Sequence, residues 1–153
     1  MSELPRTEDC NCSAVRKAAR QLTRVYDAAL AGTGLRTTQF SVLSRLGREG
    51  PMTINALAAA LVMDRTTLSR NLMPLERDKL VAIVPSEEDR RSKAVHLTKE
   101  GRQRLVLAGK HWSRAQEDFE AAFGRKRSAE LRSQLRAVVS SVDSAFGEAS
   151  DDD

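Results

Sequence analysis

The sequence between Asp64 and Asn71 holds polar side chains at a spacing that suits contact with a nucleic acid. Leu68, Leu72 and Leu75 recur at helical intervals, which predicts a helix with one buried face. The other face is left with guanidinium, hydroxyl and amide groups, which can donate to phosphates and to base edges in a major groove. The predicted contact residues of this helix are Arg65, Thr66, Thr67, Ser69, Arg70 and Asn71.

Two of these residues, Arg70 and Asn71, are the predicted base readers, because a guanidinium suits guanine and an amide suits adenine. A second group is predicted to contact phosphates, which position a protein on DNA without reading its sequence. Plain solvation of the surface is the alternative for every member. The phosphate group comprises Thr53, Thr66, Arg90 and Lys93.

A charged loop at residues 86–92 lies between two short segments with strand-like patterns, residues 81–84 and 93–97. This arrangement is typical of a β-hairpin. Its tip would carry Arg90 and Arg91, cations of the kind that enter a narrow minor groove, and Arg91 is the predicted groove residue. Asp89 is expected to pair with one of the two arginines and fix its direction. A solvated charged hairpin on an ordinary helical domain is the alternative interpretation of the loop by itself.

Local signals predict where the helices begin. Asp64 is the expected cap of the polar helix, because its carboxylate can accept from the free backbone N–H groups of the first turn. Pro74 lies inside that helix, where it removes a hydrogen bond, so we expect it to bend or loosen the last turns. Thr37, Thr53 and Thr98 are the predicted caps of three further helices.

Amphipathic patterns predict long helices at both ends of the chain. The first begins near residue 12 and ends at Gly32 and Gly34, and glycines at 47 and 50 are expected to end the second. A fifth helix is predicted over residues 98–123 and a sixth after Gly124. The predicted fold is mainly α with a small β-hairpin wing: a winged helix-turn-helix and a helical region, with about six helices and two to three short strands.

Motifs between residues 37 and 101 together point to one family, and the resemblance covers roughly residues 12–147. TTQF opens a helix at residues 37–40, Leu-Ala at 57–58 precedes Leu61, and Leu-Glu at 75–76 precedes Leu-Val at 80–81. The most specific motif is DRRSK at residues 89–93, followed by LTKEG at 97–101. With these motifs the chain resembles the MarR family of bacterial winged-helix regulators.

The resemblance implies a homodimer assembled from both chain ends. A flexible arm is expected at residues 1–11, a winged helix-turn-helix DNA-binding region at 37–98, a helical dimerisation region at 12–36 and 99–147, and a disordered acidic tail at 148–153. Two-fold symmetry would set the paired recognition helices roughly 34–36 Å apart, which implies a pseudo-palindromic operator in double-stranded DNA. Packing within one subunit is the alternative for any single apolar stripe.

The resemblance also implies a cleft between the dimerisation helices and the winged helix, where relatives bind small, often aromatic, anions. Arg16, Tyr26, Thr37 and Trp112 are the residues expected to line it as a possible effector site. Core or surface packing is the alternative for each of the four.

Cys10 and Cys12 are expected to be thiols at rest, because two cysteines two residues apart make a poor disulfide framework. Cys12 is predicted near the start of the first helix, where free N–H groups favour a thiolate. By its spacing from Tyr26 it matches the reactive cysteine of the family's organic-hydroperoxide sensors. Arg16 and Thr37 depart from that pattern, since they stand where two tyrosines are expected. A redox switch and a pair of inert thiols both stay open.

The charge distribution favours a polyanionic partner. The formal net charge is +4 over 153 residues, the size of one domain. Residues 1–12 carry −2 and residues 148–153 carry −4, which leaves +10 for the segment between them. No run of ~18 apolar residues could span a bilayer, and the N-terminus lacks the pattern of a signal peptide. We therefore expect a cytoplasmic protein without a membrane partner.

Neither catalysis nor a cofactor is predicted. The sequence contains no glycine-rich phosphate loop, no paired histidine and carboxylate motif and no nucleophile elbow. A metal site is not expected either, because Cys10 and Cys12 are too few ligands and neither His96 nor His111 is at ligand spacing.

The sequence predicts a homodimeric, sequence-specific DNA-binding transcriptional regulator, a repressor released by a small aromatic or anionic ligand. A thiol-based redox-sensing repressor that uses Cys12 and Cys10 is the alternative within the same fold. A basic protein-interaction module without an operator is the rival from another class. Only the regulator would bind selectively to a palindrome, whereas a steep salt dependence would fit both classes.

Overall fold

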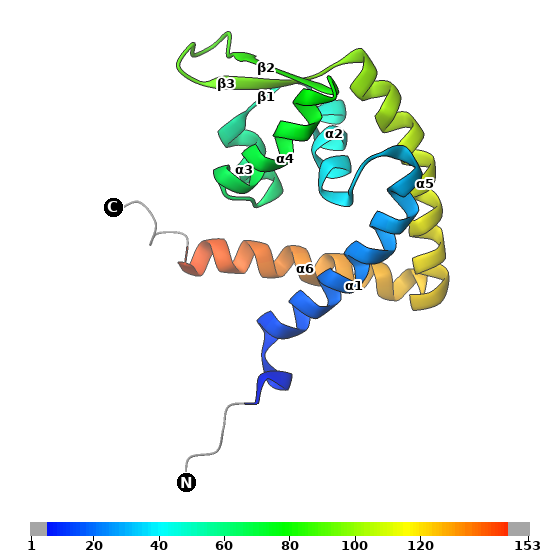
Figure 1. Cartoon of the computed structure of the whole chain (residues 1–153). Helices are drawn as coiled ribbons and strands as arrows, with labels where there is room; N and C mark the ends of the chain where they lie inside the picture. The colour runs from blue at the N-terminus through cyan, green and yellow to red at the C-terminus, as the bar shows by residue number, and fades with distance from the viewer. Residues whose placement is uncertain (1–5, 147–153) are drawn as a thin grey trace. The chain divides into compact units, whose positions relative to one another are not determined.

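The computed structural model describes residues 6–146, so the expected acidic tail and the first five residues of the expected arm lie outside the described residues. The chain forms two compact units, which divide after Ser113. The helices and strands are α1 (Asn11–Leu30), α2 (Thr37–Glu49), β1 (Met52–Thr53), α3 (Ile54–Leu61), α4 (Arg65–Arg77), β2 (Val81–Pro85), β3 (Lys93–Leu97), α5 (Lys99–Phe123) and α6 (Arg125–Phe146), with 3₁₀ turns at Thr7–Asp9 and Ala31–Thr33 (Figure 1).

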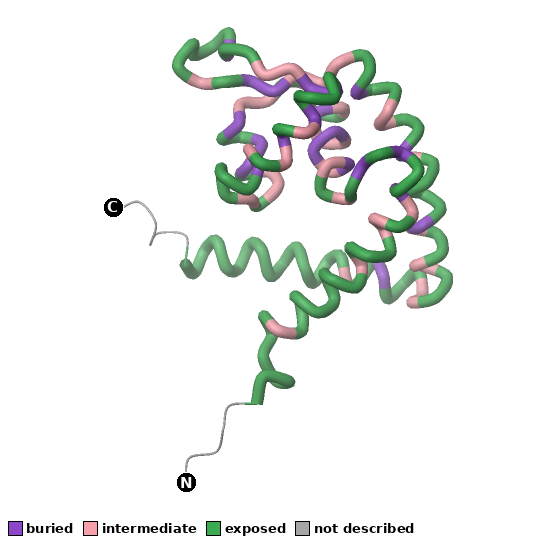
Figure 2. The backbone as a smooth tube through the Cα atoms, viewed as in Figure 1, coloured by how far each residue is buried: buried purple, intermediate pink, exposed green. Residues whose placement is uncertain are grey.

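The first unit has its core between α2, α3, α4 and the sheet, where the buried segments of the chain gather in Figure 2. Leucines dominate this core because each helix places an apolar stripe against its neighbours. Full burial of one such side chain is worth roughly 1.5–3 kcal/mol. The most completely buried leucines, at most 1% exposed, are Leu30, Leu43, Leu46, Leu57, Leu68, Leu72 and Leu75.

The sheet is antiparallel, with the strand order β1-β3-β2. Strands β2 and β3 pair from Val81 opposite Leu97 to Pro85 opposite Lys93, which confirms the predicted hairpin and extends its first strand by one residue. The short strand β1 pairs with the other edge of β3, where Thr53 lies opposite Ala94. The predicted fold class is therefore confirmed: six helices and three short strands within the described residues.

Three of the four predicted helix caps are present. The Asp64 carboxylate accepts from the backbone N–H of Thr67 at 2.8 Å. The Thr53 hydroxyl accepts from Ala56 N at 3.1 Å, and the Thr98 hydroxyl accepts from Gly101 N at 2.9 Å. Each cap satisfies a backbone donor that the first helical turn would otherwise leave without a partner.

The prediction that Thr37 caps α2 is wrong, because Thr37 is the first helical residue and Arg36 is the capping position. Two side chains satisfy the helix start instead. Asp27 Oδ1, from α1, accepts from Thr37 N at 2.7 Å, and Gln39 Oε1 accepts from Arg36 N at 2.9 Å. A carboxylate at a helix N-terminus also complements the helix dipole.

Of the two glycines expected to end α2, Gly47 lies inside the helix, and Pro74 lies inside α4 as expected. The α2 helix continues through Gly47 and ends only before Gly50. The α4 helix continues through Pro74 to Arg77, and the Pro74 carbonyl still accepts from Asp78 N at 3.0 Å. At the N-terminal end, helical structure begins earlier than expected, because a 3₁₀ turn at Thr7–Asp9 leads directly into α1.

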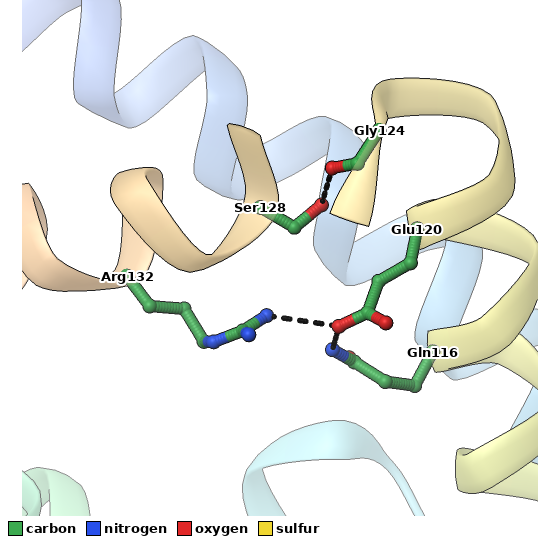
Figure 3. A network of polar contacts seen from close by, with 5 residues as sticks. All are labelled: Gln116, Glu120, Gly124, Ser128 and Arg132. Atoms are coloured by element: carbon green, nitrogen blue, oxygen red, sulfur yellow. Dashed lines mark hydrogen bonds and ion pairs between the residues drawn. The ribbon is translucent and has the colours of Figure 1, made fainter. Parts of the chain in front are cut away.

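The second unit contains residues 114–123 of α5 and all of α6, joined at Gly124, whose φ of +103° suits glycine. Figure 3 shows the polar contacts at this corner. Ser128, 1% exposed, donates from its hydroxyl to the Gly124 carbonyl at 2.8 Å. Glu120 accepts from Gln116 at 2.9 Å and from Arg132 at 3.1 Å, and these two contacts lower the pKa of the Glu120 carboxyl.

Candidate nucleic-acid interface

One face of α4 is exposed and polar, and the opposite face supplies core leucines. Leu68, Leu72 and Leu75 are buried, which orients the helix. Arg65, Thr66, Thr67 and Arg70 are exposed, whereas Ser69 and Asn71 are half-buried at the edges of the polar face. The side chains predicted for the major groove therefore occupy one surface. In Figure 1 the α4 helix lies beside the sheet that carries the wing.

The first turn of α4 is locked by Asp64. Its carboxylate accepts from the Thr67 hydroxyl at 2.6 Å and from the Thr67 backbone N–H at 2.8 Å. These two bonds lower the pKa of Asp64, because they stabilise the ionised form. Thr67 uses its hydroxyl proton in this contact, so only its oxygen lone pairs and methyl group are available to a partner.

Asn71 is also engaged within the helix, because its Nδ2 donates to the Thr67 carbonyl at 3.0 Å. Bidentate recognition of adenine needs both the amide oxygen and the amide N–H₂ group of an asparagine. The carbonyl oxygen and one amide proton of Asn71 stay available. Arg70 has no side-chain partner among the described residues, so its guanidinium is the better prepared of the two predicted base readers.

The wing loop, residues 86–92, is held by its own backbone. Ser86 N donates to the Ser92 carbonyl at 2.9 Å, and Ser92 N donates to the Asp89 carbonyl at 3.0 Å. The Asp89 carboxylate accepts from the backbone N–H of Arg91 at 3.0 Å. This contact differs from the expected pairing with a guanidinium: Asp89 orders the loop, and the exposed side chains of Arg90 and Arg91 make no ion pair within residues 6–146.

The predicted phosphate contacts come from four segments of the first unit: β1, β3, α4 and the wing loop. Thr53 is half-buried, because it ends β1 and caps α3, and Lys93 is exposed at the start of β3. Thr66 lies in the first turn of α4 and Arg90 in the wing loop. A hollow of about 230 Å³ separates α4 from the sheet, and Ser69, Met73, Ile83 and Lys93 are among its lining residues.

Met73 was missed by the sequence analysis. It is 68% exposed and follows Arg70 by three residues on the same face of α4. The helical spacing alone could have placed it there. Its apolar side chain does not belong to the pattern of hydrogen-bonding groups that predicted the other contacts.

The four residues expected at an effector cleft have different surroundings. Trp112 stacks on Phe40 with ring centroids 5.9 Å apart, and Arg16 is exposed on α1. Tyr26 is half-buried, and the Thr37 hydroxyl is buried without a hydrogen-bond partner among the described residues. An open cavity of about 470 Å³ adjoins the start of α2, but its lining residues are Asp27, Ala28, Ala31, Gly34, Leu35 and Arg36.

Both cysteines are exposed free thiols at the start of α1, where Cys10 is the capping residue and Cys12 lies in the first turn. No group of three or more histidine, cysteine or acidic side chains within residues 6–146 could hold a metal ion. No helix in the same range is long and apolar enough to cross a bilayer.

Known proteins are similar to this chain in sequence and in fold. A model of the MarR family matches residues 33–92. The transcriptional activatory protein BadR of Rhodopseudomonas palustris is 38% identical over 89 residues, which are 56% of this chain and 51% of BadR. This chain thus spans about half the length of that curated relative.

Solved structures match over nearly their whole length. The transcriptional regulator MosR of M. tuberculosis, in complex with DNA, is 38% identical, with a TM-score of 0.71 over 85% of this chain and 98% of MosR. The transcriptional repressor CouR, bound to a 23-mer DNA duplex, is 27% identical, with a TM-score of 0.79 over 90% of this chain and 99% of CouR. With its family motifs on a matching fold, the chain belongs to the MarR family of winged-helix transcriptional regulators.

Proposed function

We propose that this chain binds double-stranded operator DNA, with α4 in the major groove and the wing in the minor groove. The observation that carries the proposal is the pairing of an exposed polar face on α4 with two wing guanidiniums that have no acidic partner among the described residues. Unpaired arginines on an exposed loop gain most from an anionic partner. MosR and CouR, both solved with DNA, support the same assignment.

The active species is a homodimer. Support comes from α6, where apolar side chains at helical spacing stay exposed in the single chain: Leu135, Val138, Val139, Val142 and Phe146 are 38–72% exposed. Such a stripe is normally covered by another surface. A two-fold dimer presents two α4 helices, so its operator is pseudo-palindromic, with half-sites about one helical turn apart.

On its operator the dimer acts as a repressor and is released by a small aromatic or anionic ligand. CouR is a transcriptional repressor, whereas BadR is an activatory protein, so the sign of regulation needs its own test. The unpartnered Thr37 hydroxyl and the cavity beside the start of α2 support a ligand near α1 and α2. A ligand releases DNA only if it binds more tightly to a dimer whose recognition helices are wrongly spaced.

Oxidation of Cys12 is the second candidate signal. Its support is the exposure of Cys12 in the first turn of α1, with the exposed Cys10 two residues away. Mass spectrometry after mild peroxide, together with an operator-binding assay, separates the two signals. If oxidation leaves operator affinity unchanged, the cysteines carry no signal to the DNA-binding surface.

Selection of bound duplexes from a random DNA pool tests the proposed function. We expect a motif with two-fold symmetry and a protein that sediments as a dimer both free and on the duplex. Binding that depends steeply on salt but not on sequence would favour the rival, a basic protein-interaction module. A promoter fusion carrying the recovered motif then gives the sign of regulation.

A further inference from the structure

Met73 is an exposed apolar side chain in the middle of the polar face of α4. It is 68% exposed, and the core leucines of the same helix are at most 1% exposed. Thr66, Arg70, Met73 and Arg77 succeed one another at steps of four, three and four residues, so they form one row along the helix. This row lies opposite the buried stripe of Leu68, Leu72 and Leu75.

The side chain adds little to the stability of its own subunit, because two thirds of its surface stays in water. On one side Met73 borders the hollow between α4 and the sheet, together with Ser69 and Lys93. The next member of the row, Arg77, forms an ion pair at the end of the helix, where its Nε donates to Asp78 at 3.0 Å. Met73 is therefore the last member of the row that is free to meet a base.

The chemistry of the major groove supplies one apolar partner, the C5-methyl group of thymine. A thioether chain is flexible and polarizable, so it adapts to such a small apolar group. The neighbouring Arg70 would contact polar base edges from the preceding turn of the helix. An apolar contact one turn further along would then add sequence information that hydrogen-bonding residues do not provide.

We propose that Met73 is a specificity-determining residue that contacts a thymine methyl group in each operator half-site. This inference rests on the proposed DNA-binding function. The contact selects thymine over cytosine and over a thymine that lacks its methyl group. Burial of one methyl group is worth about a fourfold change in affinity. The expected preference is therefore modest at each half-site and multiplies over the two halves of a dimer.

The probe is the duplex recovered from the random pool, with each thymine replaced in turn by deoxyuridine, which lacks only the methyl group. We expect wild-type affinity to fall about fourfold at one thymine of each half-site. Met73→Ala should bind the unmodified duplex more weakly, and at that thymine it should show no further loss with deoxyuridine. Met73→Gln should shift the selected base there towards adenine, because an amide pairs with adenine.

Val106→Ala is the matched control, because Val106 is also an exposed apolar residue, 61% exposed, but lies on α5. Because α5 belongs to the expected dimerisation region, the readout for this variant is the ratio of affinities for the unmodified and deoxyuridine duplexes, which should equal the wild-type ratio at every thymine. Thermal unfolding midpoints of both Met73 variants should match the wild type, since the side chain is exposed. A selective wild type whose profile is unchanged by Met73→Ala overturns the role of Met73 alone. A wild type that selects no duplex overturns the proposed function, and the role of Met73 with it.

Discussion

Thr67 donates two hydrogen bonds to the carboxylate of Asp64, from its hydroxyl at 2.6 Å and from its backbone N–H at 2.8 Å. The residue that caps α4 thus also fixes a side chain on the predicted DNA-binding face. The start of the reading helix is ordered before any DNA arrives, which reduces the conformational entropy lost on binding.

Asp64→Ala should destabilise the protein more at neutral pH than in acid, because the ionised carboxylate is the stronger cap. The hydrogen bonds from Thr67 lower the pKa of Asp64 in the folded state. The part of its contribution that depends on charge is therefore fully present above the ordinary aspartate pKa of about 3.9 and is lost as the pH falls through the folded value. Urea unfolding of both proteins from pH 3 to 7 measures the difference. Asp64→Asn keeps an acceptor oxygen, so its stability relative to Asp64→Ala should not vary with pH.

Arg91→Ala should weaken operator binding at least tenfold at constant salt, because it removes the predicted minor-groove cation. Fluorescence anisotropy with the selected duplex measures the affinity. Lys110→Ala, which removes an exposed cation from α5, is the control and should change affinity by less than twofold. An unchanged affinity of Arg91→Ala would remove the wing from the mechanism.

Gly101→Ala should destabilise the first unit by roughly 1–3 kcal/mol or more. A Cβ at this position would lie 2.0 Å from the Leu80 carbonyl oxygen, so the turn after α4 or the start of α5 must shift. Gly109→Ala on the same helix is the matched control. Nothing lies within 4 Å of a Cβ there, and alanine should stabilise the helix by up to about 1 kcal/mol. Denaturant unfolding that shows equal effects at both positions would contradict this packing.

Val138→Glu should convert the proposed dimer to monomers and reduce operator affinity more than tenfold, because it places a charge on the exposed apolar stripe of α6. Sedimentation velocity at micromolar concentration measures the oligomeric state. Ser133→Glu adds the same charge on the opposite face of α6 and should leave the dimer intact. A dimer that survives Val138→Glu would place the subunit interface elsewhere.

The features that the sequence predicted correctly depend on residues that are close together in the chain. Asp64, Thr53 and Thr98 cap helices whose donors lie three residues along the chain, so the residue type and spacing were sufficient. The cap of α2 could not be read in this way, because Asp27 reaches it from a different helix. The role of Asp89 differs for a related reason: a carboxylate beside two arginines can also bond to the backbone, and loop geometry decides between them.

Contacts between segments far apart in the chain could not be predicted from the sequence. The motif LTKEG was recognised, but only the structure places Gly101 against the Leu80 carbonyl, which explains a glycine inside a helix. The site residues and the dimer stay predictions, since their partners are DNA and a second chain. Met73 was not predicted because it is apolar, whereas the predicted DNA contacts are all polar side chains.

The short strand β1 has a mechanical consequence. Thr53 lies opposite Ala94 of the hairpin and, in the same residue, caps α3. The wing therefore cannot tilt without pulling on the first helix of the helix-turn-helix. Because α3 packs against α4, the wing and α4 should move together, so a distortion at one DNA groove would be transmitted to the other.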